Sequence, residues 1–173
     1  MNMRTAIKRS CDVYFYEVAR RLGVDRLSET AKQFGLGRQI LEGFLEERSG
    51  VVPNTKWKKK FIGKNWYLGE TLHSGIGQGY YQTTPMQLCL MMAQIANGGY
   101  EIKPRIIRNE KNKQNNLKDY LNFLNEGLDE TGLIASNFNV KPLFRNKENI
   151  NFIKDALYAA TNEPGGTSYK SRL

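Results

Sequence analysis

Ser10 and Asp12 have the side chains in this sequence best suited to moving or holding a proton. They flank Cys11 in a Ser-x-Asp triplet that directly precedes an apolar helical pattern. A serine hydroxyl both donates and accepts a hydrogen bond, while a carboxylate accepts, so the pair suits a general acid-base network. The same triplet is also a common start of a helix, because Ser and Asp satisfy free N–H groups of the first turn. The three residues alone leave both interpretations open.

A second candidate for chemistry is the run Gly75-Ile76-Gly77-Gln78-Gly79. Glycine loops that bind dinucleotides follow an apolar strand and open directly into a helix. Here no apolar strand precedes the run, and the next predicted helix begins only at Pro85. We therefore expect these glycines to allow close approach of the backbone to another strand or to a ligand, and not to bind a pyrophosphate.

The sequence offers little for metal or disulfide chemistry. Cys11 and Cys89 stand far apart, and His73 is the only histidine. Since neither zinc-ligand spacing nor a disulfide framework is present, we expect no metal and no cofactor. Both cysteines are predicted to be small residues of the core.

The charge balance permits an anionic partner. Lys and Arg number 26 against 17 Asp and Glu, a net charge of +9, and the densest cluster is Lys56-Trp57-Lys58-Lys59-Lys60. A small basic nucleic-acid-binding protein is therefore one alternative function, with steep salt dependence as its expected signature. We favour a solvated helical face with Trp57 and Phe61 turned inward, and expect no nucleic-acid partner.

Helical signals surround these candidates. Apolar spacing predicts a helix over 12–22 with Asp12 as its N-cap and Gly23 as its stop, and a second helix from Asp25 that ends at Gly35 and Gly37. Thr84, Pro85 and Gln87 form a capping box, and the helix that follows should bury a stripe of four residues. The members of that stripe are Leu88, Met91, Met92 and Ile95.

The other segments give weaker patterns. Frequent glycines between Ile40 and Tyr81 favour irregular connections and short strands. Residues 109–139 are rich in Asn, Lys and Asp, so we expect a variable, loosely ordered insertion there. A last helix contains Ile150, Ile153, Leu157 and Tyr158, with Asn146 or Asn149 as its cap. No stretch is apolar enough for a signal peptide or a transmembrane segment.

Several segments, in this order, closely resemble the transpeptidase domain of the penicillin-binding protein 2 family. The resemblance covers about 7–107 and returns at 162–167. It rests on Ser10-Cys11-Asp12-Val13-Tyr14-Phe15-Tyr16-Glu17, Gly23-Val24-Asp25-Arg26-Leu27, Phe34-Gly35-Leu36-Gly37, Glu46-Glu47-Arg48-Ser49-Gly50 with Pro53, Gly75-Ile76-Gly77-Gln78-Gly79-Tyr80, Thr84-Pro85-Met86-Gln87 and Asn162-Glu163-Pro164-Gly165-Gly166-Thr167. The resemblance implies an α+β fold. Residues 1–173 would be one incomplete penicillin-binding (serine β-lactamase-like) transpeptidase domain, mainly its helical subdomain.

In that family three motifs converge on one pocket: Ser-x-x-Lys, Ser-x-Asn and Lys-Ser/Thr-Gly. Only the second has a match here, with Asp12 in place of the commoner asparagine, and the nucleophilic serine has no counterpart in this chain. By resemblance, Ser10 belongs to the proton-shuttling network, and Asp12 orients the lysine or the substrate amide. Leu41-Glu42-Gly43-Phe44 departs from the family pattern and puts the local packing near the pocket in question.

The resemblance also implies a role for the parent protein. It would be a D,D-transpeptidase that cross-links peptidoglycan stem peptides in cell elongation and binds β-lactams. It would lie at the periplasmic face of the inner membrane, among membrane proteins of the elongation complex. This chain by itself is expected to be inactive, because the nucleophile and its base lie outside it. A non-catalytic cell-envelope interaction module is the other alternative.

Overall fold

The computed structural model describes residues 1–41, 44, 46–104, 142–144 and 146–171. Within these residues the chain is mainly helical, and β-structure is limited to two isolated antiparallel bridges, Val51 with Gln82 and Tyr100 with Pro142. The expected insertion at 109–139 lies outside the described residues, as do two members of the Leu41–Phe44 departure. The structure is thus consistent with a mainly helical part of an α+β domain.

The first three helices follow one another closely. Helix α1 spans Met3–Lys8 and begins at Asn2, whose side chain accepts a hydrogen bond from the N–H of Thr5. Helix α2 spans Asp12–Leu22, as predicted, but Cys11 and not Asp12 is its N-cap. Helix α3 spans Val24–Gln33 and begins one residue before the predicted start, because Gly23 ends α2 and caps α3 at once. Gly23 adopts a φ of 78°, which glycine tolerates.

Two short helices occupy a region that was predicted to be irregular with short strands. Helix α4 spans Thr55–Phe61, with the Asn54 side chain accepting from the N–H of Trp57 at 2.7 Å, and helix α5 spans Leu68–Gly75. The prediction of short strands is wrong for the residues described here, among which the one β-interaction is the bridge at Val51. Helices of seven and eight residues are too short to give a clear apolar period in the sequence.

Helix α6, Pro85–Ala96, has the predicted start but not the predicted buried face. Thr84 and Gln87 form the capping box, with Pro85 in the first turn. The residues that are buried are Leu90 and two glutamines, Gln87 and Gln94. Leu88 and Met92 are 44% and 46% exposed, so the predicted apolar stripe is wrong in its orientation. The glutamine amides are satisfied by backbone carbonyls of other segments, which makes their burial tolerable.

Helix α8 spans Lys147–Asn162, and Asn146 is its cap, one of the two predicted. A tight turn follows it, and a short 3-10 helix, η1, spans Tyr169–Ser171. Gly166 lies so close to the end of α8 that an added Cβ would stand 2.3 Å from the carbonyl oxygen of Ala160. The turn therefore folds back tightly on the helix that precedes it.

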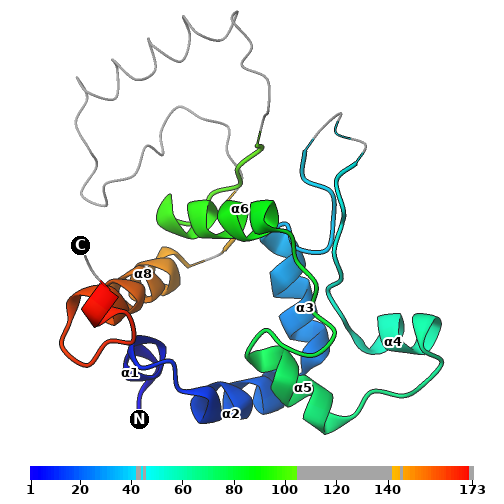
Figure 1. The fold of residues 1–173 in the computed structure, drawn as a ribbon, viewed down its shortest axis with the longest axis horizontal. Coiled ribbons are helices and arrows are strands. Elements are labelled where there is room, and N and C mark those ends of the chain that lie inside the picture. Colours follow the sequence, from blue (N-terminus) through cyan, green and yellow to red (C-terminus); the bar gives the residue numbers. More distant parts are fainter. Residues whose placement is uncertain (42–43, 45, 105–141, 145, 172–173) are drawn as a thin grey trace, which may run out of the picture.

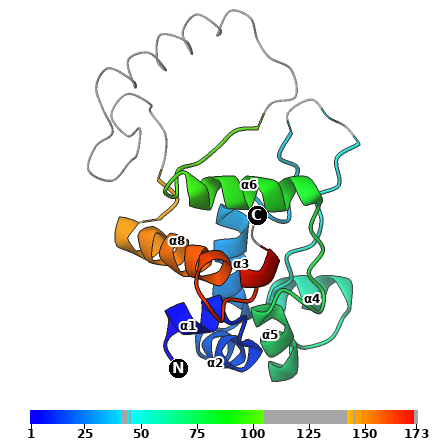
Figure 2. The ribbon, with the colours of Figure 1, turned by 60° about the vertical axis from the view of Figure 1, so that its left-hand side comes forward.

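The helices contact one another in a continuous series, visible in Figure 1 and Figure 2. Helix α2 packs on α5, α3 contacts both, α6 contacts α8, and α8 packs along α1, which joins α2. Small side chains permit the close contacts: Ala6 of α1 and Ala156 and Ala159 of α8 are completely buried. As a result, helices from the two ends of the sequence lie side by side.

Gly75 shows why the glycine run is needed. An added Cβ at Gly75 would stand 2.4 Å from the Cβ of Ala19 and 3.0 Å from the carbonyl oxygen of Phe15, both on α2. The prediction of close backbone approach is confirmed, although the partner is a helix and not a strand or a ligand. Gly77 and Gly79 adopt positive φ values in the turns that follow.

Candidate functional site

Ser10 occupies the tight turn between α1 and α2. Its φ is +50°, the only positive value of a non-glycine residue in the described part of the chain. Two backbone hydrogen bonds hold the turn: the N–H of Ser10 donates to Ile7 O at 3.2 Å, and that of Cys11 donates to Ala6 O at 2.9 Å. Left-handed backbone is unfavourable for serine, so the turn depends on these bonds and on the packing of α1 and α2. The exposed Ser10 side chain is thereby turned toward the segment after α8.

The Ser10 hydroxyl meets the hydroxyl of Thr167, 157 residues later in the sequence. The two oxygens are 2.9 Å apart, and Thr167 Oγ1 also lies 2.8 Å from the carbonyl oxygen of Lys8. A carbonyl oxygen only accepts, so Thr167 uses its one hydroxyl proton for Lys8 and accepts from Ser10. The Ser10 proton therefore points at Thr167, and the lone pairs of Ser10 Oγ stay available to accept a proton or a hydrogen bond.

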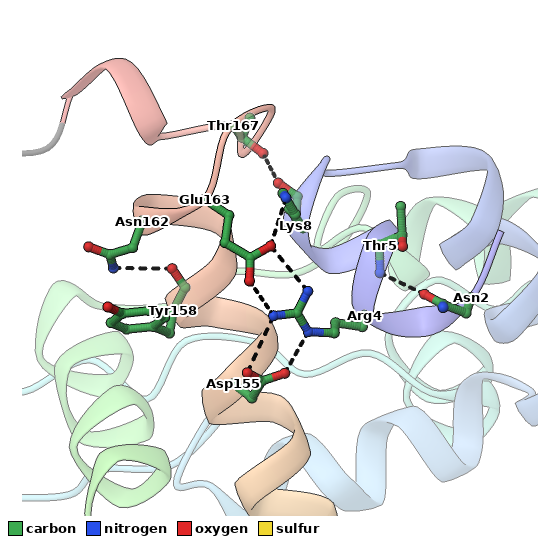
Figure 3. Close-up of polar contacts among 9 residues, drawn as sticks. All are labelled: Asn2, Arg4, Thr5, Lys8, Asp155, Tyr158, Asn162, Glu163 and Thr167. Atoms are coloured by element: carbon green, nitrogen blue, oxygen red, sulfur yellow. Dashed lines mark hydrogen bonds and ion pairs between the residues drawn. The ribbon is translucent and has the colours of Figure 1, made fainter.

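Thr167 is fixed by its backbone as well as by its side chain. Its N–H donates to the same Lys8 carbonyl at 3.0 Å, and the neighbouring N–H of Ser168 donates to Ala160 O at 3.0 Å. Figure 3 shows Thr167 reaching the end of α1 from the turn after α8. The turn at 163–167 is therefore attached both to α8 and to the residues just before Ser10.

An ion-pair network joins α1 to α8 beside this site (Figure 3). Arg4 contacts Asp155 at 2.6 Å and Glu163 at 2.5 Å, and Lys8 Nζ contacts Glu163 at 2.8 Å. The hydrogen bonds from Arg4, and then from Lys8, lower the pKa of Glu163 to about 2. The hydrogen bond from Arg4 likewise lowers the pKa of Asp155 below its ordinary value, and Glu163 and Asp155 raise that of Arg4. The network keeps both carboxylates charged at neutral pH and aligns α1 on α8.

Asp12, the other predicted site residue, is exposed and is the first residue of α2. A carboxylate at this position interacts favourably with the free N–H groups and the positive end of the helix dipole. Asp12 and Ser10 thus lie on either side of Cys11 at the start of α2, and Ser10 is the one that contacts Thr167. This placement agrees with a helix-starting role for Asp12 and leaves its carboxylate open to a further partner.

The sequence patterns did not point to several of the side chains that surround Ser10. Thr5 to Lys8 was not predicted to contribute to the site, yet α1 packs on α8 and Ala6 is completely buried. Thr167 was named as the last residue of the 162–167 segment and was given no role. The one available signal was that the 162–167 segment and the Ser10 triplet both belong to the same family resemblance, which places them near one pocket. Because these two segments are far apart in the sequence, no local pattern indicated that they are in contact.

The remaining candidates are separated from this position. Cys89 is exposed and Cys11 is half-buried, so the prediction of two core cysteines is wrong for Cys89. It lies on α6, whose outward side the sequence could not assign. Across the described residues, no three His, Cys, Asp or Glu side chains are arranged to hold a metal ion. Nor does any helix in that part of the chain combine the length and the apolar character needed to cross a membrane.

Comparison with known families gives one consistent result. The family model described as "Penicillin binding protein transpeptidase domain" matches residues 1–171, nearly the whole chain. The curated protein "Peptidoglycan D,D-transpeptidase MrdA" of Escherichia coli K12 is 33% identical over 172 residues, and that of Salmonella typhimurium SL1344 is 32% identical over 170. Each alignment covers 98% of this chain, and 24% and 25% of the respective relatives. The chain therefore spans about a quarter of the length of these relatives.

Solved structures agree with the sequence comparisons. A crystal structure of Pseudomonas aeruginosa PBP2 in complex with WCK 5153 is similar with a TM-score of 0.77 and 31% identity, covering 98% of this chain and 34% of that one. A complex between PBP2 and MreC from Helicobacter pylori is similar with a TM-score of 0.74 and 25% identity, covering 99% and 28%. The arrangement of helices described above is thus that of part of a penicillin-binding transpeptidase fold.

Proposed function

Because this chain belongs to the penicillin-binding protein transpeptidase family, we propose that it supplies one wall of a serine acyl-transfer site. The parent reaction is the cross-linking of peptidoglycan stem peptides during cell elongation. A serine outside this chain attacks the terminal D-Ala-D-Ala carbonyl and D-alanine leaves. An amine on a neighbouring stem peptide then resolves the acyl-enzyme.

The observation that carries the proposal is the contact between Ser10 and Thr167. These residues come from two widely separated segments, each of which resembles the family. Their contact directs the Ser10 proton toward Thr167 and leaves the Ser10 oxygen able to accept. In the proposed reaction Ser10 relays a proton between the nucleophile and the leaving group, and Asp12 orients a lysine or a substrate amide. Neither residue is the one acylated by penicillin.

The chain by itself is proposed to be inactive. Its 173 residues contain no Ser-x-x-Lys, and the closest approach to Lys-Ser/Thr-Gly is Lys170-Ser171-Arg172. Without a nucleophile no covalent intermediate forms, and without the lysine no base activates one. This tripeptide has an arginine where the motif requires a glycine, whose missing side chain lets a substrate backbone approach.

The surroundings of the parent enzyme are a further part of the proposal. The Helicobacter pylori relative was solved together with MreC, which supports elongation-complex membrane proteins as partners. We place the parent at the periplasmic face of the inner membrane, where stem peptides and β-lactams are accessible. The non-catalytic interaction module has no separate observation in its favour.

Labelled penicillin tests the proposal on two proteins. The 173-residue chain should retain no label after denaturation and washing. The longest natural polypeptide that contains it should retain label, and the DNA on either side should encode Ser-x-x-Lys upstream and Lys-Ser/Thr-Gly downstream.

In that polypeptide, Ser10→Ala should slow acylation by about 10²–10⁴-fold, the usual loss of a proton-transfer group. The matched control Ser49→Ala removes an exposed serine that lies outside α1, α2 and the 163–167 turn, and it should leave the rate unchanged. Label retained by the chain alone, or normal acylation in Ser10→Ala, would contradict the proposal.

A further inference from the structure

Four apolar side chains are exposed together on residues 56–68, a segment that we call the basic tip. It comprises α4 and the connection to the start of α5, and α4 projects from the side of the molecule in Figure 1. Phe61 is 67% exposed, Tyr67 63%, Leu68 59% and Ile62 38%. The prediction that Phe61 turns inward is therefore wrong. Exposed apolar groups that gather in this way mark an interaction site more often than isolated ones do.

The tip carries a strong excess of positive charge. Lys56, Lys59, Lys60 and Lys64 are exposed, and no acidic residue occurs between Thr55 and Gly69. Of the two acidic residues that border the tip, Glu70 is already paired with the buried Lys58 and also accepts from the hydroxyl of Tyr80, while Asp25 accepts from Thr55. The charge of the four exposed lysines is therefore not neutralised within the tip.

Buried groups hold the tip in this shape. Lys58 is only 2% exposed and lies over the rings of Tyr67 at 4.6 Å and Trp66 at 5.8 Å. The Trp66 Nε1 donates to Thr71 at 2.8 Å, which attaches the connection to α5. Lys58 was expected on a solvated face, but it fills the interior of the tip. Because that interior is already occupied, the apolar side chains point outward from a supported backbone.

We propose that the basic tip docks on the surface of an anionic phospholipid bilayer. Lysines near such a surface are attracted by its negative potential, and aromatic and aliphatic side chains enter the headgroup boundary between them. Phe61, Ile62, Tyr67 and Leu68 fit this environment, because aromatic rings favour the interface and aliphatic groups favour the acyl region. A nucleic acid would use the lysines and stack on the rings, but it offers nothing to Ile62 and Leu68.

Intrinsic fluorescence provides a specific readout, because both tryptophans of the chain, Trp57 and Trp66, lie in the tip. The 173-residue chain is mixed with vesicles of phosphatidylcholine alone or with phosphatidylglycerol added. Only the anionic vesicles should sediment the chain, shift the emission to shorter wavelength and, with brominated lipids, quench it. Raising the salt concentration should weaken the binding.

Two matched pairs of variants test the two components. Lys59→Ser with Lys60→Ser should weaken partitioning by about thirtyfold, from the usual attraction per lysine. Lys32→Ser with Lys103→Ser removes the same charge elsewhere on the surface and should have a much smaller effect.

Phe61→Ser should weaken partitioning by about tenfold. Phe152→Ser, which alters a side chain 42% exposed on α8, should leave it unchanged. Circular dichroism verifies that each variant keeps its helix content.

The outcomes are distinct. Absence of binding to anionic vesicles overturns the proposal. So does binding that Phe61→Ser leaves intact, or equally tight binding to a lipid-free polyanion such as heparin or RNA, since either would indicate a purely electrostatic site. Vesicle binding involves neither Ser10 nor penicillin, so it holds or fails independently of the proposed transpeptidase role.

Discussion

Glu163 is the residue on which the contact between α1 and α8 converges. It accepts from both Arg4 and Lys8, and the carbonyl of that same Lys8 holds Thr167 against Ser10. Its pKa of about 2 is below its ordinary value of 4.5, so the folded chain binds the proton less readily than the unfolded chain. The charged form therefore stabilises the folded chain above pH 4.5, and this stabilisation is lost as the pH falls from 4.5 to about 2.

Exchange of the Thr167 amide hydrogen, which bonds to Lys8 O, reports this effect. After correction for the intrinsic pH dependence of exchange, its protection should fall between pH 4.5 and about 2. In Glu163→Gln it should be lower at neutral pH and should fall less across that range, because only Asp155 then remains to titrate between α1 and α8.

Glu17→Gln is the matched control. Glu17 also has its pKa lowered to about 2, by hydrogen bonds from Arg20 and then Arg21, but all three residues lie on α2. This variant should keep the pH dependence at Thr167. A flat profile in the unchanged chain would show that the Glu163 pairs do not hold α1 on α8.

At the same scale, the sequence supports a prediction of part of the site. Ser10 and Asp12 are recognisable because their neighbours along the chain resemble the family in order and spacing. The contact of Ser10 with Thr167 depends on helix packing across 157 residues, which no local pattern reports. Arg4 and Lys8 resembled ordinary surface charges for the same reason, since their carboxylate partners lie more than 150 residues away.

Among the elements, α2 and α5 pack closely, and the missing side chain of Gly75 permits this approach. Gly75→Ala places a methyl group against Ala19 and the Phe15 carbonyl, so one helix must move. We expect a cost of about 1–3 kcal/mol, the usual range for overpacking. Amide hydrogen exchange in α2 and α5 should then be about tenfold faster or more.

Gly69→Ala provides the comparison within the same helix. An added Cβ at Gly69 meets nothing within 4 Å. Alanine has the higher helix propensity, so this variant should exchange no faster and is expected to gain up to about 1 kcal/mol. Equal acceleration in both variants would mean that the contact with α2 does not limit position 75.

The helices that the sequence predicted are those with local start and stop signals. Gly23 ends α2, and Thr84 with Gln87 starts α6, through hydrogen bonds within a few residues. The buried face of α6 was wrong because burial depends on its neighbours, and two backbone segments satisfy Gln87 there. The prediction of a solvated face for Lys58 was wrong for the same reason, since its burial depends on the ion pair with Glu70 of the next helix.

For the whole molecule, the balance between buried and exposed apolar groups is unfavourable. The buried apolar residues among those described are mostly small or medium in size. They are Ala6, Ala19, Val24, Leu36, Val52, Leu90, Ile150, Ala156 and Ala159. Large side chains such as Leu88, Met92 and Phe152 remain more than 40% exposed. Hydrophobic stabilisation scales with the apolar area removed from water, so the helices of this chain have a limited core.

We therefore expect the purified 173-residue chain to melt gradually. The helical signal in circular dichroism should be lost over a broad temperature range. A dye such as ANS should bind before melting begins. A sharp cooperative transition with no dye binding would show that the described contacts suffice for a stable domain. Phe152→Ser should change the transition little, because it removes an exposed side chain.

The pairing of α1 with α8 also imposes an order of events during synthesis. Residue 10 leaves the ribosome long before residue 167, so the Ser10 hydroxyl has no threonine to donate to while most of the chain is being made. The carboxylates that pair with Arg4 and Lys8, those of Asp155 and Glu163, are likewise synthesised late. The contact between Ser10 and Thr167 therefore cannot form before residue 167 has been synthesised, and a message broken ahead of the Thr167 codon would yield a polypeptide in which Ser10 lacks this partner.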